Sequence, residues 1–391
     1  MTATRGATSG VLAVAGVLLL AASMRAGIAG VPPVLDDLGL QSAAKSLLVT
    51  IPVVCFGLGA LAGPALRAAI GEERALFAVL VLLLAGLLVR AAWPESWLFP
   101  GTILAGLGIA GINVLLPSLI RHRFRAHAGA MTAAYTTALG VGAALTAGVA
   151  VPVLQATDSI EAALAVAVPP AALALLAWLP QLRAGRGHVR RRRRRTPGGR
   201  SVWRQPLAWQ VTLFMGLQSV LYYGPLSWLP SIYRDHGVDA AAAGLLLMVM
   251  QLLSIVGSTI APLLATRSRD QRPAIAGALA LISAGALGLL VAPTVAPALW
   301  AVLLGIGQGA AFSLALLVIV LRAADGDTAA DLSSMAQFGG YAIATIGPLT
   351  MGLLHGATGG WTAPLALLMV VAAVALAAGL ASGRDRLVGA R

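Results

Sequence analysis

The sequence predicts an all-α membrane protein whose twelve transmembrane helices form two pseudo-symmetric halves of six helices. Three observations support this fold class. The chain of 391 residues is 59% hydrophobic and only 10% charged, whereas about a quarter of the residues in a soluble protein are charged. Twelve mostly apolar runs are each long enough to cross a bilayer, which takes roughly 20 residues. An arginine-rich segment divides these runs six and six.

The twelve runs give the expected order of elements. We expect helices at residues 10–31, 44–66, 75–93, 97–120, 127–154 and 161–180, and again at 207–232, 241–265, 274–293, 297–321, 331–355 and 361–381. The first run has some features of a signal peptide, but its apolar character continues past the expected cleavage point. The predicted domains are an N-terminal bundle at 1–182, a basic linker at 183–205 and a C-terminal bundle at 206–391.

Basic residues are distributed unevenly over the predicted loops. Of the 27 Lys and Arg residues, 23 lie in the N-terminal tail, the even-numbered loops and the C-terminal tail, and only Lys45, Arg90 and Arg234 lie in odd loops or at their edges. Positive charge favours the cytoplasmic side. We therefore expect a multi-pass protein of the plasma (cytoplasmic) membrane, a monomer with both termini in the cytoplasm. The run Arg190–Arg195 is interpreted as part of a flexible cytoplasmic linker and as a candidate contact for anionic lipid, with no nucleic-acid role.

The two halves carry matching residues at nearly constant offsets. At an offset of 198 the matched pairs are Gly39 with Gly237, Gly59 with Gly257, and Pro64 with Pro262. At an offset of 199, residues 106–116 match residues 305–315, and Arg123 matches Arg322. Repeated Gly and Pro matches at a fixed spacing indicate duplication of a six-helix unit. In transporters built this way, substrate binds near the bilayer midplane, between the repeats.

Polar side chains inside the apolar runs indicate a candidate substrate site, because such groups are costly in lipid and tend to mark a solute pathway. They are nearly absent from the third, sixth, ninth and twelfth runs. The candidate substrate-binding residues are Arg25, Asn113, Tyr135, Gln218, Tyr222, Tyr223, Gln251, Gln308, Gln337 and Tyr341. The alternative for each residue is an interhelical hydrogen bond that only holds helices together.

Arg25 lies inside the first apolar run, and its guanidinium stays charged in any protein environment. We predict that it is the main anion-binding group, because Gly27 and Gly30 are expected to leave open space beside it and no Asp or Glu lies deep in any run. Offsets of 197 and 198 carry position 25 onto Tyr222 and Tyr223, so hydroxyl donors are expected opposite the cation. The alternative is that the side chain extends along its helix to the outer interface.

Several other functional classes lack their sequence motifs. The one cysteine, Cys55, excludes an internal disulfide and is expected to be buried. The sequence has no phosphate-binding GxxxxGK[ST] loop, no catalytic set and no metal-ligating cluster. We therefore expect no ATP-driven pump, no enzyme, no cofactor and no metal. Proton coupling stays open, but Glu161 and Asp331 at run edges are not expected to carry it.

Four segments carry a resemblance to the cyanate and 2-nitroimidazole transporter family of the major facilitator superfamily. They are GINVLLPSLIRHRFRAHAGAMTAAYT (111–136), QSVLYYGPLSWLPSIY (218–233), GIGQGAAFSLALLVIVLRAAD (305–325) and MAQFGGYAIATIGPLTMGLLHGATGGW (335–361). The resemblance implies the major facilitator fold, in which the third, sixth, ninth and twelfth helices face lipid. It also implies a secondary active transporter that moves a small anion or small polar planar solute through a central cavity by alternating access. The alternative is an efflux pump for neutral drug-like compounds.

Overall fold

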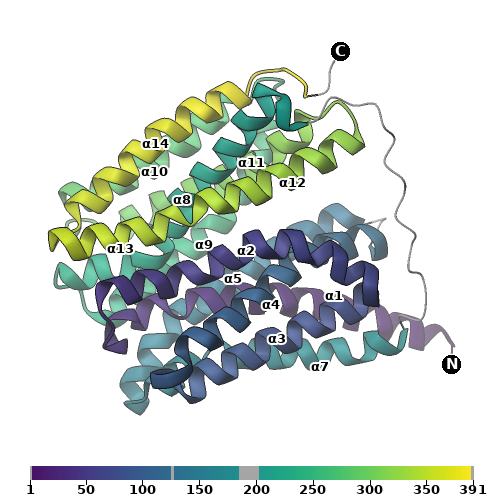
Figure 1. The fold of residues 1–391 in the computed structure, drawn as a ribbon, viewed down its shortest axis with the longest axis horizontal. Helices are drawn as coiled ribbons and strands as arrows, with labels where there is room; N and C mark the ends of the chain where they lie inside the picture. Colours follow the sequence, from purple (N-terminus) through teal and green to yellow (C-terminus); the bar gives the residue numbers. More distant parts are fainter. Residues whose placement is uncertain (1, 125–126, 185–201, 389–391) are drawn as a thin grey trace. The chain divides into compact units, whose positions relative to one another are not determined.

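A computed structural model describes residues 2–124, 127–184 and 202–388, and Figure 1 shows them as helices joined by connecting segments. In this part of the chain, the one β-type pairing is an isolated bridge between Ala323 and Val388. The 3-10 helices are η1 (Pro32–Leu38) and η3 (Val202–Arg204). The α-helices are α1 (Thr2–Ala29), α2 (Ser42–Ile70), α3 (Glu72–Ala92), α4 (Pro94–Arg123), α5 (Ala128–Thr157), α6 (Ile160–Ala165), α7 (Val168–Ala184), α8 (Pro206–Asp235), α9 (Ala240–Ala265), α10 (Arg272–Val291), α11 (Pro297–Leu321), α12 (Gly326–Ala344), α13 (Ile346–Thr358) and α14 (Thr362–Ser382).

Helices cover all of the predicted spans. The bounds of α11 agree with the predicted range, whereas α1 begins earlier than expected, at Thr2. The span predicted at 161–180 is divided into α6 and α7, and the span predicted at 331–355 is divided into α12 and α13. Proline explains both divisions, because it has no N–H to donate to the carbonyl four residues earlier. Pro169 and Pro170 follow the first break, and Pro348 follows the second.

Ten segments of the described chain are long and apolar enough to cross a membrane. The two other predicted spans are α8 and the α12–α13 pair. Helix α8 has 30 residues but contains internal prolines and several Gln, Ser and Tyr residues, while α12 has 19 residues, with Asp, Ser and Gln among them. The chain is thus an all-α membrane protein, as predicted. Its least apolar spans are two of those that carry the candidate site residues.

Burial separates the spans only in part as the resemblance implies, because α5 at 44% and α9 at 39% are not expected to face lipid and yet are no more buried than α3. In the most apolar stretch of each span, only 33% of residues are buried in α14 and in the α6–α7 segment, against 67% in α1 and α4 and 61% in α11. Helices α3 and α10, also expected to face lipid, have intermediate values of 50% and 39%. Apolar side chains that remain exposed on membrane helices are suited to contact with lipid tails.

The packing of α3 on α4 is repeated in the packing of α10 on α11. A Cβ atom added at Gly108 would lie 2.6 Å from the backbone nitrogen of Leu83, and one added at Gly307 would lie 2.9 Å from that of Ile282. Gly307 corresponds to Gly108, and Ile282 corresponds to Leu83, at the predicted offset of 199. Contact this close requires glycine, because real Cβ atoms essentially never approach another heavy atom within 3 Å. The repeated contact supports the predicted duplication.

A second pair of matched glycines precedes α2 and α9. Gly39 has a φ of 65° and Gly237 a φ of 81°. This left-handed region is readily available only to glycine. The two positions are 198 residues apart, so the turn that opens the second helix of each repeat is built in the same way.

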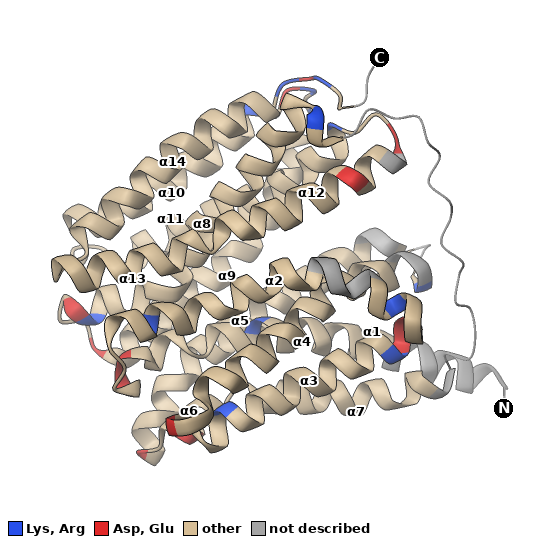
Figure 2. Ribbon diagram, viewed as in Figure 1, with Lys and Arg blue, Asp and Glu red and all other residues tan. Residues whose placement is uncertain are grey.

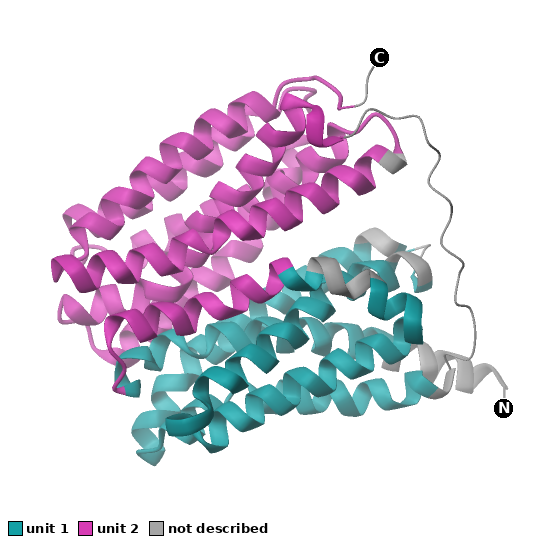
Figure 3. Ribbon diagram, viewed as in Figure 1, with its two compact units in different colours: residues 1–38, 58–192 teal, residues 39–57, 193–391 magenta. Residues whose placement is uncertain are grey.

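The chain divides into two compact units, one containing residues 1–38 and 58–192 and the other residues 39–57 and 193–391 (Figure 3). The units meet at three points of the sequence, which are between Leu38 and Gly39, inside α2 between Gly57 and Leu58, and inside the arginine-rich linker. The run Arg190–Arg195 and most of the predicted linker at 183–205 lie outside the described residues.

Acidic residues lie toward helix ends, as Figure 2 shows in red. All fourteen Asp and Glu residues of the chain lie in connecting segments or near a helix end, and Asp331 is the farthest from an end, at the sixth position of α12. The prediction that no carboxylate lies deep in a span is therefore confirmed. Glu161, in the first turn of α6, accepts a hydrogen bond from the hydroxyl of Ser159 at 2.7 Å.

Candidate substrate-binding site

Arg25 lies on α1 and is half-buried. The structure corrects the prediction that Gly27 and Gly30 leave open space beside it. A Cβ atom at Gly27 would contact Ile109 at 3.3 Å and Leu87 at 3.5 Å, and one at Gly30 would lie 3.5 Å from Thr146. The two glycines therefore let neighbouring helices approach α1 closely. The space that a ligand would need beside Arg25 does not come from them.

Arg90 is a second buried arginine of the first unit, and the sequence predicts its place at a loop edge but not its burial. Its side chain is only 1% exposed, in the last turn of α3, and its Nη1 donates to the carbonyl of Gly27 at 3.0 Å. The residue lies three positions before the end of the run predicted at 75–93, so its sequence position resembles that of an interfacial cation. Its hydrogen-bond partner is a backbone carbonyl, and such a partner cannot be predicted from residue types.

Tyr222, Tyr223 and Gln251 meet between α8 and α9 in the second unit. The two tyrosine rings lie edge to face, with centroids 5.0 Å apart. The side-chain amide of Gln251 donates to the hydroxyl of Tyr222 at 2.9 Å. Gln251 and Tyr223 are buried, whereas Tyr222 is half-buried. Three of the predicted site residues thus form one polar and aromatic cluster, with a hydroxyl at its less buried side.

Phe56 extends this cluster and was missed from the sequence. Its ring centroid lies 6.0 Å from that of Tyr223 and 5.2 Å from that of Tyr341 on α12. Phe56 lies on α2, in the part that belongs to the second unit, and its neighbour Cys55 is buried as predicted. A phenylalanine in an apolar run gives no polar signal, so only the tertiary contacts identify it. The four rings form a continuous aromatic row through the second unit.

Gln218 and Gln308 are both 1% exposed, and both donate to backbone carbonyls of α8. The amide of Gln218 donates to the carbonyl of Met215 at 2.9 Å, and that of Gln308 donates to the carbonyl of Leu221 at 2.9 Å. A carbonyl can only accept, so neither amide can be reversed. Each Oε1 is buried without a donor among the described residues, at a cost of about 1–3 kcal/mol.

The remaining candidate residues lie on α4, α5 and α12. Gln337 on α12 donates to the hydroxyl of Ser333 on its own helix at 2.9 Å. Asn113 on α4 and Tyr135 on α5 are half-buried in the first unit. Chemically, the first unit offers a permanent cation at Arg25, and the second offers a phenolic hydroxyl, buried amides and aromatic ring faces. Within the second unit, the hydroxyl, the amides and the ring faces suit binding of a small polar solute.

Comparison with known sequences gives matches along most of the chain. Residues 12–345 match the sequence model of the Major Facilitator Superfamily. The chain is 38% identical over 381 residues to the 2-nitroimidazole transporter of Escherichia coli (strain K12), covering 96% of both chains. It is also 38% identical over 381 residues to the uncharacterized transporter YycB of Bacillus subtilis (strain 168), covering 96% of this chain and 94% of that one. Identity to the cyanate transport protein CynX of Escherichia coli (strain K12) is 31% over 349 residues, covering 88% and 90%.

Solved structures with similar folds include two transporters. One is a bacterial homolog of the human lysosomal transporter Spinster in an inward-facing and occupied conformation, with a TM-score of 0.75, 16% identity and coverage of 98% of this chain and 99% of that one. The other is a D-xylose-proton symporter, with a TM-score of 0.70, 16% identity and coverage of 97% of both chains. At this identity the likeness concerns the fold alone.

Proposed function

Because the chain belongs to the Major Facilitator Superfamily and is therefore a membrane transporter and not an enzyme, we propose that it moves a small anion or small polar planar solute. In this proposal the solute binds in a central cavity between the two predicted six-helix halves, 1–182 and 206–391. Alternating access then exposes that cavity to each side of the membrane in turn, and a monomer suffices for transport.

One pairing of residues carries the proposal. Arg25 supplies a cation within the span of α1, and Tyr222, with Gln251 bonded to it at 2.9 Å, supplies a hydroxyl in the corresponding span of the duplicated half. A guanidinium is a planar fork of donors and matches a flat or linear polar group better than an ammonium does. A solute held by both groups would offset the cost of the buried charge and draw the halves together.

The relatives support this choice of substrate class. Two of them are named for 2-nitroimidazole and for cyanate, a small flat polar heterocycle and a small anion. Both carry oxygen or nitrogen atoms that can accept hydrogen bonds from a guanidinium and from a tyrosine hydroxyl. The row of rings at Phe56, Tyr222, Tyr223 and Tyr341 offers faces against which a flat solute can stack.

A ligand screen on detergent-purified, monodisperse protein tests the proposed function. The panel contains cyanate, nitrate, small carboxylates and 2-nitroimidazole, with neutral apolar drugs as the comparison set. A true ligand raises the midpoint temperature of unfolding as its concentration increases, because it binds the folded state. We expect at least one small anion or flat polar solute to do so and to be taken up by proteoliposomes. Stabilisation by the neutral apolar drugs alone would favour drug efflux instead.

Orientation forms part of the proposal, with both termini in the cytoplasm. The basis is the location of 23 of the 27 Lys and Arg residues in the tails and even loops. A matched pair of cysteines in a Cys55→Ala background tests it. Ser268 lies exposed between α9 and α10, and Val295 is 80% exposed between α10 and α11. In intact cells, an impermeant thiol reagent should label Val295→Cys and not Ser268→Cys. The reverse labelling pattern would overturn the orientation.

A further inference from the structure

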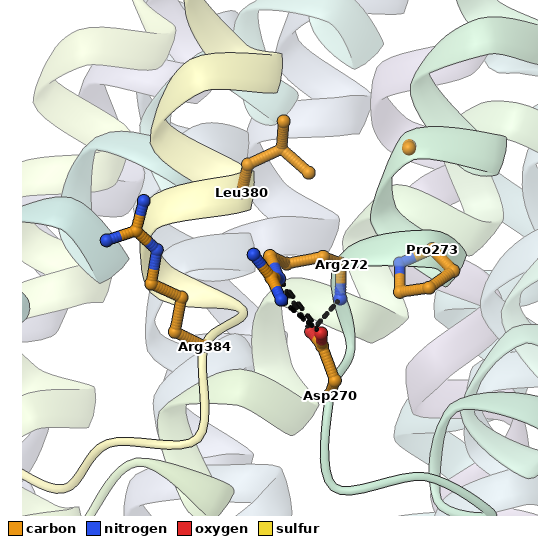
Figure 4. Close-up of a pocket in the computed structure, with 6 residues that line it drawn as sticks. Asp270, Arg272, Pro273, Leu380 and Arg384 are labelled. Carbon is orange, nitrogen blue, oxygen red and sulfur yellow. Dashed lines mark hydrogen bonds and ion pairs between the residues drawn. The ribbon is translucent and has the colours of Figure 1, made fainter.

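A cavity lies where α10 begins and α14 ends. Its volume is about 380 Å³, and it lies within the second unit. Figure 4 shows Arg272 between Asp270 and Arg384, with Leu380 on the neighbouring turn of α14. The cavity is lined by Asp270, Arg272, Pro273, Ala276, Leu380 and Arg384. Charged groups and apolar groups therefore line the same small space.

The charges of this cavity leave one positive charge in excess. Asp270 accepts from Nε of Arg272 at 2.9 Å and from Nη2 at 2.6 Å, and these bonds lower the pKa of the carboxyl to about 2. The carboxylate is therefore ionised at physiological pH and neutralises Arg272. The neighbouring carboxylate, Asp385, lies 3.5 Å from the guanidinium of Arg322. Arg384 is exposed, and no described carboxylate forms an ion pair with it.

The apolar part of the cavity is continuous with helices that suit contact with lipid. Pro273 and Ala276 belong to α10 and Leu380 belongs to α14, and these two helices pack on each other. Both are long and apolar enough to cross a membrane. Farther along them, apolar side chains stay exposed, among them Leu287 at 48% and Val370 at 60%. Both helices therefore offer exposed apolar side chains to acyl chains.

We propose that this cavity binds an anionic phospholipid, with the phosphate at Arg384 and the start of the acyl chains against Leu380. The rest of this end of the second unit suits an anion as well. The segments 266–272 and 383–388 together with Arg322 contain six arginines and two aspartates. A zwitterionic headgroup carries no net charge to match this excess, so the site distinguishes lipids by charge. The site does not depend on the identity of the transported solute.

The test measures binding of dioctanoyl phosphatidylglycerol to the full-length purified protein, by native mass spectrometry and by the thermal midpoint. Dioctanoyl phosphatidylcholine is the zwitterionic comparison, and sn-glycerol 3-phosphate is the phosphate ester without tails. We expect Arg384→Gln to weaken phosphatidylglycerol binding about fivefold, the effect of one basic side chain at a charged membrane surface. Leu380→Ser should also weaken it. Arg386→Gln is the matched control, because Arg386 is exposed on the same segment but does not line the cavity, and it should weaken binding less than Arg384→Gln does.

Each other result counts against the proposal. Equal binding by Arg384→Gln and wild-type protein, or equal affinity for phosphatidylcholine and phosphatidylglycerol, would overturn the site. If sn-glycerol 3-phosphate binds as tightly as the lipid and Leu380→Ser has no effect, the cavity takes a free phosphate ester and the lipid assignment is wrong. Both altered side chains are at least partly exposed, so the variants are expected to fold, and a monodisperse elution profile checks this.

Discussion

Arg25→Ala is expected to abolish substrate binding by the purified protein. The substitution removes the permanent cation within α1, and with it the group that we propose as the main anion ligand. Arg25→Lys keeps the charge but replaces the planar fork with a single ammonium. We expect that variant to fold and to bind at least about tenfold more weakly, a loss of about 1.4 kcal/mol. Tyr222→Phe removes the hydroxyl that Gln251 contacts and should have an intermediate effect.

Ligand affinity on monodisperse protein is the measurement for these variants. Lys45→Gln is the control for overall charge, because it also removes one positive charge but lies in the first turns of α2. It should bind as wild-type protein does. Near wild-type affinity in Arg25→Ala would show that the arginine only extends along α1 to the interface, and the proposed substrate site would then lose its cation.

The second large effect is expected at Arg322, where Arg322→Ala should strongly destabilise the second unit. The side chain is 2% exposed, and it connects three segments that are distant in sequence. Its Nε donates to the carbonyl of Ser382 at 3.1 Å, and its Nη2 donates to the carbonyl of Gly383 at 3.0 Å and to the side chain of Gln271. Removing one partner of such a buried charged network costs about 3 kcal/mol or more.

A lower thermal midpoint and faster proteolysis of the segment after α14 are the expected readouts for Arg322→Ala. Burial lowers the pKa of the Arg322 guanidinium, while Asp385 and Asp270 oppose that shift, and the group stays charged at working pH. Arg123→Ala is the matched control, because Arg123 occupies the equivalent position in the other repeat but is exposed. Equal loss of stability in the two variants would contradict a specific role for the buried network.

Hydropathy predicts the helices well because each span must satisfy its own backbone hydrogen bonds in lipid. That rule locates α11 correctly. It misses the early start of α1 and the breaks before Pro169 and Pro348, where the loss of one or two backbone donors divides a span. The duplication can also be predicted from the sequence, because Gly108 matches Gly307 at the offset of 199. The structure supports it, since Gly108 contacts Leu83 and Gly307 contacts the equivalent residue, Ile282.

The candidate site is less predictable from the sequence than the helices are, because an apolar run does not show in which direction each side chain points. Polarity identifies Tyr222 and Gln251, which the structure joins by a hydrogen bond. It does not identify Phe56, whose part in the aromatic row depends on tertiary contact. It also gives no sign that Arg90 turns inward to the carbonyl of Gly27. Charge and hydropathy report residue types, whereas these roles depend on neighbours.

The glycine contacts between α3 and α4, and between α10 and α11, bear on how the protein moves. At Gly108 and Gly307 the facing helices touch through backbone atoms, so no layer of side chains lies between them to change rotamer. Sliding or rotation of one helix against the other would push backbone into backbone, and interfaces of this kind do not deform continuously. Each pair is therefore expected to move as one rigid body during the transport cycle.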